Sequence, residues 1–250
     1  EEAEEEASLF SKLQHPNVVQ FIGYGVEGSQ PVIVSELMST DLRKYLDEKK
    51  KNAGEGRPLP LLVAMNILLQ IAEAMTYLHE NGVMHRDLKA NNVLINVVEG
   101  PDGQLSSSSV QVKLTDFGEA KLKLHDSGYT TLMKGTTAYL DPECAITGKF
   151  SDKSDVYSFG VVLVELITGR KVKDGTRPQG EQYLMAWARP LLDKRNLDEL
   201  VDPQLGKTYN VSQMQAMILA AALCVQQSSQ RPKISEVLKM LDEVSNTDED

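Results

Sequence analysis

The segment HRDLKANN, residues 85–92, decides the fold of this chain together with the segment TDFG, residues 115–118. Each segment carries one aspartate, Asp87 or Asp116, in a polar stretch beside a short β-rich run. A single aspartate in a loop is usually a turn former or a helix cap, so neither residue alone indicates a function. Two such segments in this order rarely arise by chance, and together they predict an active site.

The polar side chains of these segments suit the transfer of a phosphoryl group from ATP. That reaction needs a carboxylate to receive the hydroxyl proton, hard oxygen ligands for Mg²⁺, and a positive charge near the phosphates. Asp87 can orient the acceptor hydroxyl and take its proton, and Asn92 and Asp116 are suitable metal ligands. Lys89 can neutralise charge that develops on the transferred group.

Further motifs lie on both sides of these segments. They are EASLFSKLQHPN at 6–17, DPE at 141–143, DVYSFG at 155–160 and Arg231 followed by proline. With them, the chain resembles eukaryotic protein kinases over nearly its whole length, and the plant receptor-like and Raf-like Ser/Thr kinases in particular.

The resemblance implies an α+β, protein-kinase-like fold with segregated strands and helices. Residues 1–38 are expected to form a partial N-lobe with the αC helix, two strands and the hinge. Residues 39–250 are expected to form a mostly helical C-lobe with the catalytic loop, the activation segment and the substrate platform.

Four residues outside the catalytic loop receive structural roles from the resemblance. Glu143 and Arg231 are expected to form a buried ion pair that fixes the substrate-binding segment. Asp155 is expected to bind backbone amides of the catalytic loop. Glu6 stands where the family pairs a glutamate with the lysine of the third strand, although it is one of five glutamates in a segment that is otherwise typical of a solvated helix. Asp141 replaces the alanine of the usual A-P-E motif, and no catalytic role is assigned to it.

The nucleotide base has an expected site as well. Residues 31–38 resemble the fifth strand and the hinge, with Ser35 as the gatekeeper. Glu36 and Met38 would offer backbone groups to adenine, and Leu94 would lie under the base.

An apolar stack is expected to link the two lobes. Its members by resemblance are Phe10, Phe21, His85 and Phe117. This position favours a packed structural role for His85 over a role as general base.

Substrate choice and regulation follow from other residues. Lys89, two residues after Asp87, is the Ser/Thr-type choice, and Thr136 would bind both of these residues in the P+1 loop. Arg86 can hold a phosphorylated activation loop by bidentate hydrogen bonds, which makes Thr130 and Thr131 candidate regulatory sites. Expected partners are a protein substrate with a Ser or Thr acceptor and an upstream activating kinase or receptor.

The phosphate-gripping elements of the family are not found before Glu6. That stretch contains neither a glycine-rich loop nor a lysine, and Gly23 and Gly25 lie after the αC-like segment. Removing part of such a preorganised clamp commonly costs about 10²–10³ in rate, so residues 1–250 alone are expected to bind ATP weakly and turn over slowly. The alternative reading is a truncated kinase or pseudokinase scaffold that binds partners without transferring phosphate.

Composition narrows the class of partner and the compartment. A formal net charge of −10 argues against nucleic acid or an anionic membrane surface, and it suggests basic substrates. Cys144 and Cys224 lack metal-ligand spacing and favour a reduced, cytoplasmic protein. No apolar run approaches the roughly 20 residues of a spanning helix, so no direct membrane insertion is expected. The first residue is not Met, which suggests a piece of a longer protein, and the resemblance to receptor-like kinases allows that protein to be attached to the plasma membrane.

The periodicity of apolar residues predicts the main elements. Helices are expected at 1–14, 40–51, 61–81 and, approximately, at 154–169, 180–194, 211–226 and 232–245. Strands are expected at 18–25, 31–38, 93–96 and 110–115, with a solvated Ser-rich loop at 99–109.

Overall fold

The structure is a computed structural model that describes residues 2–28, 30–51, 59–98, 100, 105–106, 109–122, 137–202 and 209–245. The helices are α1 (Glu2–Phe10), α2 (Leu42–Lys51), α3 (Leu61–Glu80), α4 (Pro142–Thr147), α5 (Asp152–Thr168), α6 (Leu184–Asp193), α7 (Leu197–Leu200), α8 (Val211–Cys224) and α9 (Ile234–Ser245). The strands are β1 (Phe21–Glu27), β2 (Gln30–Ser35), β3 (Thr40–Asp41), β4 (Val83–Met84), β5 (Val93–Val97), β6 (Val110–Leu114) and β7 (Lys121–Leu122). Short 3₁₀ turns are η1 (Ala90–Asn92), η4 (Thr137–Tyr139) and η6 (Ser228–Gln230).

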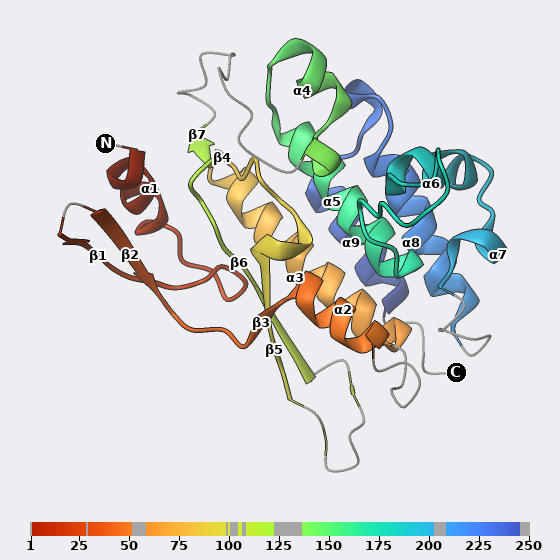
Figure 1. Ribbon diagram of the computed structural model, residues 1–250, viewed down its shortest axis with the longest axis horizontal. Helices are drawn as coiled ribbons and strands as arrows, with labels where there is room; N and C mark the ends of the chain where they lie inside the picture. Colours follow the sequence, from red (N-terminus) through yellow and green to blue (C-terminus); the bar gives the residue numbers. More distant parts are fainter. Residues whose placement is uncertain are drawn as a thin grey trace.

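Strands and helices are segregated, as expected for the α+β fold (Figure 1). The hairpin β1–β2 and helix α1 lie on one side, and most helices lie on the other. Between them is an antiparallel sheet in the order β3-β5-β6. The hairpin side is joined to this sheet where Val18 bridges Leu114.

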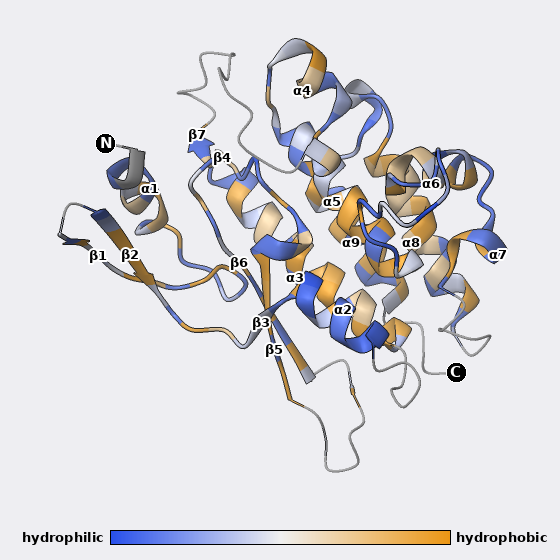
Figure 2. Cartoon of the chain, in the orientation of Figure 1, coloured by the Kyte–Doolittle hydropathy of each residue, from blue (hydrophilic) through white to orange (hydrophobic). Residues whose placement is uncertain are grey.

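Helix α3 is the centre of the helical part. Eleven of its twenty residues are buried, on most sides of the cylinder, and it packs against α5, α9 and β6. By length and composition it is the one helix among the described residues that could cross a membrane. Its burial inside the protein is that of a core helix, and Figure 2 shows it among the other apolar helices α5 and α8.

The first helix ends earlier and the first strand begins later than predicted. The chain between them forms a tight turn and then pairs with β6. The prediction of a helix to residue 14 is wrong at its end. The amides of Lys12 and Leu13 bond the carbonyls of Leu9 and Phe10, and this tight turn buries Leu13. The strand then begins at Phe21, because Val19 bonds Leu114 of the other sheet instead of β2.

Two other boundaries also differ from the prediction. Strand β2 ends at Ser35, because the amide of Gln20 donates to the side chain of Glu36 instead of to its backbone carbonyl. Helix α6 begins at Leu184 and not near 180, because Tyr183 pairs with Lys173 in an isolated bridge. The short elements β3, β4, β7, α4 and α7 carry too few residues for a periodic signal, and the prediction missed them.

Candidate active site

The candidate catalytic loop runs from β4 to β5 and is held from below by helix α5. Asp155, in the first turn of α5, accepts hydrogen bonds from the amides of His85 and Arg86 at 2.9 and 2.8 Å. Nε2 of His79 lies 2.9 Å from the same carboxylate. These are the amide contacts expected of Asp155, and they hold Arg86 in the left-handed region at φ 68°.

Burial and hydrogen bonding act in opposite directions on this carboxylate. Complete burial by itself raises the pKa of Asp155, but hydrogen bonds and charge from His79, the charge of His85 and the Arg86 amide lower it. The net effect is a pKa below the ordinary value of 3.8. Asp155 is therefore ionised in the folded protein at neutral pH, as a carboxylate accepting several donors should be.

Three candidate catalytic side chains meet in the loop. Nζ of Lys89 lies 2.5 Å from Oδ2 of Asp87. Nδ2 of Asn92 donates to the same oxygen at 3.0 Å and to the Asp87 carbonyl at 2.9 Å. Both side-chain contacts fall on one carboxylate oxygen. In the part of the chain that the structure describes, Oδ1 of Asp87 is left to accept a further donor.

A backbone hydrogen bond places the segment that carries Asp116 next to the loop that carries Asp87, Lys89 and Asn92. The amide of Thr115 donates to the carbonyl of Asn92 at 3.0 Å, so the two predicted metal ligands stand on adjacent paired segments. Asp116 itself lies in the left-handed region at φ 64°, a strained conformation for a residue with a side chain. Such strain is found most often where a side chain must be aimed at a functional site.

Glu6 faces Asp116 across Gly118. A Cβ added at Gly118 would lie 3.5 Å from Oε2 of Glu6 and 3.5 Å from Oδ1 of Asp116. Partial burial, and secondly the charge of Asp116, raise the pKa of Glu6. The two carboxylates therefore lie close enough for the charge of one to act on the other.

The residues present fit Mg²⁺ bound together with a nucleotide. Asn92 turns its amide nitrogen to Asp87, so its side-chain oxygen would be free to bind the metal together with the Asp116 carboxylate. Among the described residues, no group of three His, Cys, Asp or Glu side chains could hold a metal by itself. A cation here needs further oxygens from phosphates and water, which is the usual binding mode of Mg²⁺.

The apolar stack has the expected members in contact. The rings of Phe21 and Phe10 are 5.5 Å apart, those of Phe10 and Phe117 4.9 Å, and those of Phe117 and His85 5.2 Å. His85 is fully buried, and its Nε2 lies 3.1 Å from the Thr115 carbonyl. The geometry thus agrees with a packed His85.

Residues 36–39, between the hairpin and helix α2, contact both the hairpin side and the β3-β5-β6 sheet. Lys113 of β6 pairs with Glu36 at 2.6 Å, and the Gln20 amide donates to the same carboxylate at 2.7 Å. Burial raises the pKa of Glu36, but the contacts with Lys113 and Gln20 outweigh it and lower the pKa. Met38 is buried, and Asn96 accepts two hydrogen bonds from Ser39.

The predicted hinge residues accordingly lie where β2 leads into α2. Leu94, predicted to lie under the base, is half-buried on β5 and paired in register with Asp41.

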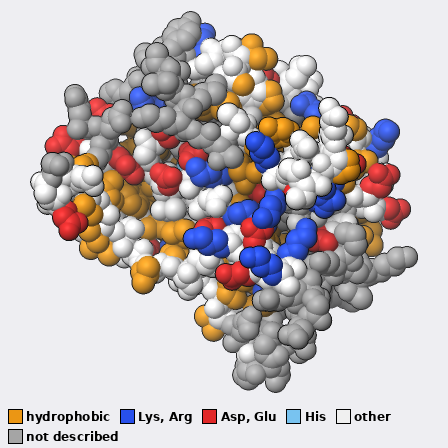
Figure 3. All heavy atoms as spheres, in the orientation of Figure 1, with side chains coloured by type: hydrophobic (Ala, Val, Ile, Leu, Met, Phe, Trp, Pro, Cys, Tyr) orange, Lys and Arg blue, Asp and Glu red, His pale blue; other side chains and the backbone are white. Residues whose placement is uncertain are grey.

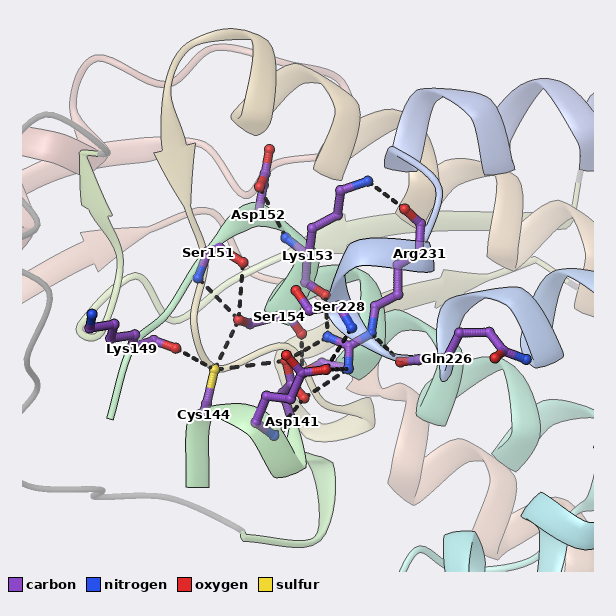
Figure 4. A network of polar contacts seen from close by, with 12 residues as sticks. Asp141, Cys144, Lys149, Ser151, Asp152, Lys153, Ser154, Gln226, Ser228 and Arg231 are labelled. Atoms are coloured by element: carbon purple, nitrogen blue, oxygen red, sulfur yellow. Dashed lines mark hydrogen bonds and ion pairs between the residues drawn. The ribbon is translucent and has the colours of Figure 1, made fainter. Parts of the chain in front are cut away.

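The prediction that Glu143 is the buried partner of Arg231 is wrong. Nη1 and Nη2 of Arg231 donate to the carboxylate of Asp141 at 2.5 and 2.8 Å, and both side chains are 2% exposed. Glu143 lies 3.8 Å from Arg231 and is 48% exposed. Figure 4 shows the Arg231 guanidinium directed at Asp141, where α4, α5 and the turn before α9 meet.

Asp141 holds this place because it is the residue that begins helix α4. Its Oδ1 also accepts the amide of Glu143 at 3.0 Å, as an N-cap does. Glu143 lies two residues later, is half exposed, and accepts a hydrogen bond from the Ser228 amide.

A third buried carboxylate joins three elements. Glu165 of α5 is fully buried and accepts hydrogen bonds from the Tyr139 hydroxyl at 2.5 Å and from Arg43 at 3.0 Å. Burial raises the pKa of Glu165, and burial beside this carboxylate raises that of Tyr139. Sequence reasoning missed this group, although one glutamate within the apolar run of α5 is a signal for a buried, paired charge.

The candidate regulatory residues are only partly described. The guanidinium of Arg86 lies over the Phe150 ring at 4.6 Å. Thr130, Thr131 and Thr136 lie outside the described residues, so their predicted contacts stay predictions.

An α+β fold with this loop, these converging carboxylates and this helical platform defines a protein kinase. The family model for the protein kinase domain matches residues 1–241, and the chain belongs to this family. Members of the family use ATP with Mg²⁺.

Curated relatives of the chain include plant protein kinases. Serine/threonine-protein kinase PBL35 of Arabidopsis thaliana is 40% identical over 245 residues, which is 94% of this chain and 46% of that protein. Probable serine/threonine-protein kinase PBL6 is 39% identical over 97% of this chain and 56% of its own length. Proline-rich receptor-like protein kinase PERK3 is 35% identical over 96% and 46%. The chain thus spans about half the length of these relatives.

Proposed function

We propose that this chain is the catalytic part of a protein serine/threonine kinase, which transfers the γ-phosphoryl group of ATP to a Ser or Thr hydroxyl of a protein. The observation that carries the proposal is the arrangement of Asp87, Lys89 and Asn92 around one carboxylate oxygen, with Asp116 held beside them. The names of the plant relatives and Lys89 support the Ser/Thr class.

Each side chain has a defined task in this proposal. Lys89 and Asn92 fix the Asp87 carboxylate through Oδ2, so Oδ1 faces the acceptor hydroxyl, orients it and receives its proton. Lys89 also places a positive charge beside the group being transferred. Asn92 and Asp116 would hold Mg²⁺, which neutralises phosphate oxygens when it is bound.

The adenine end of the nucleotide would lie along residues 36–39, which we call the connector between β2 and β3. Backbone groups of Glu36 and Met38 would bind adenine, with Leu94 beneath it. The Lys113 and Asn96 contacts support this role, because they hold the connector against the sheet that carries Leu94. The division into a partial N-lobe, residues 1–38, and a C-lobe, residues 39–250, belongs to the same proposal.

Regulation and setting are proposed from the resemblance. Phosphorylation of Thr130 or Thr131 by an upstream kinase or receptor complex would create a ligand for Arg86, and Thr136 would contact Asp87 and Lys89. A cytoplasmic setting fits the receptor-like kinase names among the relatives.

The proposal is tested with radiolabelled ATP, Mg²⁺ and a mixed Ser/Thr peptide library. We expect residues 1–250 to transfer label slowly, and Asp87→Asn to lower the rate by about 10²–10⁴ because it removes the proton acceptor. Circular dichroism and urea unfolding serve as the control for folding. If Asp87→Asn leaves the rate unchanged, Asp87 is not the proton acceptor. If the chain binds peptides and never transfers label, the scaffold alternative is favoured.

A further inference from the structure

Positive charge is concentrated on one face of an otherwise acidic molecule. Helix α2 carries five basic and two acidic residues, and the turn 169–173 carries three basic residues and no acidic one. These two segments therefore have a formal charge of +6, although the whole chain has −10. In Figure 3, Lys and Arg side chains gather over this middle region, with some acidic side chains among them.

The two segments lie against each other. Nζ of Lys171 pairs with Asp47 of α2 at 3.1 Å, and Nζ of Lys50 reaches the Gly169 carbonyl at 3.2 Å. We call the lysines of this region the basic face. Its members are Lys44, Lys49, Lys50, Lys51, Lys171 and Lys173.

The basic face is not simply a set of helix-capping charges. Lysines at the end of α2 are favoured by the helix dipole, so Lys49 to Lys51 alone need no partner to explain them. Lys44, however, lies in the first turn, where a positive charge opposes the dipole, and its side chain is 72% exposed. Lys171 and Lys173 are exposed residues of a turn. Lys44 pairs with Asp41 at 3.3 Å and Lys171 with Asp47 at 3.1 Å, but both lysine side chains are more than half exposed, so these pairs add little to stability.

Arginines of the same two segments have structural partners. Arg43 pairs with Glu165 and Asp47. Arg170 stacks on Trp187 with its guanidinium 3.8 Å from the ring centre. The side chains of Arg43 and Arg170 are 12% and 10% exposed, so the more exposed lysines provide most of the solvent-facing positive charge.

The basic face adjoins the acceptor side of the candidate active site. Helix α2 packs on η1, the last turn of the catalytic loop. Arg43 of α2 and Tyr139, which precedes the platform helix α4, meet at the carboxylate of Glu165. A substrate segment that leaves Asp87 can run directly over α2.

We infer that the basic face binds an acidic segment of the protein substrate, next to the Ser or Thr that receives the phosphoryl group. The inference rests on the proposed kinase function and reverses the expectation of basic substrates drawn from net charge. Ten helical residues span about 15 Å, which an extended peptide covers in about five residues. The acidic residues are therefore expected within about five positions of the acceptor.

Binding is measured without phosphotransfer, so that the two proposals can fail separately. Three fluorescein-labelled peptides share a central Ser and have flanks of Glu and Asp, of Lys and Arg, or of Gly and Ala. Fluorescence anisotropy with residues 1–250 is expected to show tightest binding for the acidic peptide, and binding should weaken as salt rises. The double variant K171E/K173E is expected to weaken it by about tenfold or more, since each reversal replaces an attraction by a repulsion.

The matched control is K233E/K239E, which makes the same change in net charge on exposed lysines of the α9 region. The control variant is expected to keep the dissociation constant of the acidic peptide within about twofold of the wild-type value. Circular dichroism checks the fold of both variants. Equal weakening by both variants, or equal binding of acidic and basic peptides, would overturn the inference. So would binding of phosphatidylserine vesicles or RNA in place of the acidic peptide. Acidic-peptide binding without any phosphotransfer would sink the proposed catalytic function and leave the basic face as a docking site.

Discussion

At the scale of single residues, the buried guanidinium of Arg231 shows how a carboxylate is selected by position. A buried charge must be neutralised, and Asp141 and Glu143 are both within reach. Asp141 has one fewer side-chain torsion to fix and already points inward as the N-cap of α4. It therefore takes the buried pair, and Glu143 remains at the surface.

Loss of the Asp141 carboxylate should leave the guanidinium of Arg231 buried, with the half-exposed Glu143 at 3.8 Å as its remaining carboxylate among the described residues. We expect Asp141→Asn to lower the free energy of unfolding by about 3–5 kcal/mol, measured by urea denaturation. Glu143→Gln is the matched control and should cost less than about 1 kcal/mol, because this residue is half exposed. Equal losses in the two variants would contradict the assignment.

The same reasoning applies to Asp87. Its partners Lys89 and Asn92 come from the same short loop, so their meeting follows from local chain geometry. The partner of Arg231 lies 90 residues away in sequence, and no local pattern shows which carboxylate will reach it.

At the scale of elements, α5 organises the helical part. Its first turn holds the catalytic loop through Asp155, and Glu165 in its last turns holds α2 and Tyr139. Between these points, Gly160 allows α8 to come close, since a Cβ there would lie 2.7 Å from Cβ of Cys224. That separation is shorter than carbon atoms in contact tolerate.

Gly160→Ala tests this close approach. Alanine usually stabilises a helix relative to glycine by about 0.8–1.0 kcal/mol, but here the added methyl group must push α5 and α8 apart. We expect a net loss of about 1–3 kcal/mol in the free energy of unfolding. The control is Gly175→Ala, where a Cβ would meet nothing within 4 Å, and it should be neutral or slightly stabilising. A stabilised Gly160→Ala protein would show that the helices can move apart freely.

At the scale of the whole molecule, the ionised form of Asp155 links pH to global stability. The pKa of Asp155 is below 3.8 in the folded protein, so folding favours the ionised form. This contribution is fully present above the unfolded value and is lost as pH falls through the folded pKa. The stability it supplies should therefore disappear only under strongly acidic conditions.

Asp155→Asn makes this linkage measurable. At about pH 7 we expect a loss of about 1–3 kcal/mol, because the amide leaves donors of His79 and the loop unsatisfied. The difference from the wild type should stay constant down to about pH 5 and shrink below the ordinary value of 3.8. Urea unfolding across this range measures it, and a difference that grows on acidification would reverse the predicted sign.

The position of the lysines on the surface is also decided at the scale of the whole molecule. Net charge predicted basic substrates, but a sum over the chain carries no position. Folding brings α2 against the turn 169–173, although more than 100 residues separate them in sequence, and so gathers the lysines into one face.

The local sequence was sufficient to place the chain in the protein kinase family and to predict the long helices, because these signals lie within one loop or one helical period. It also indicated the apolar stack, whose rings are in contact. Strand limits such as Phe21 and Ser35 depended on which distant segment a backbone group paired with. The partner of Arg231, the Glu165 junction and the basic face were decided only by tertiary structure. Each depends on contacts between residues far apart in the chain, where burial and distance select among several chemically equivalent side chains.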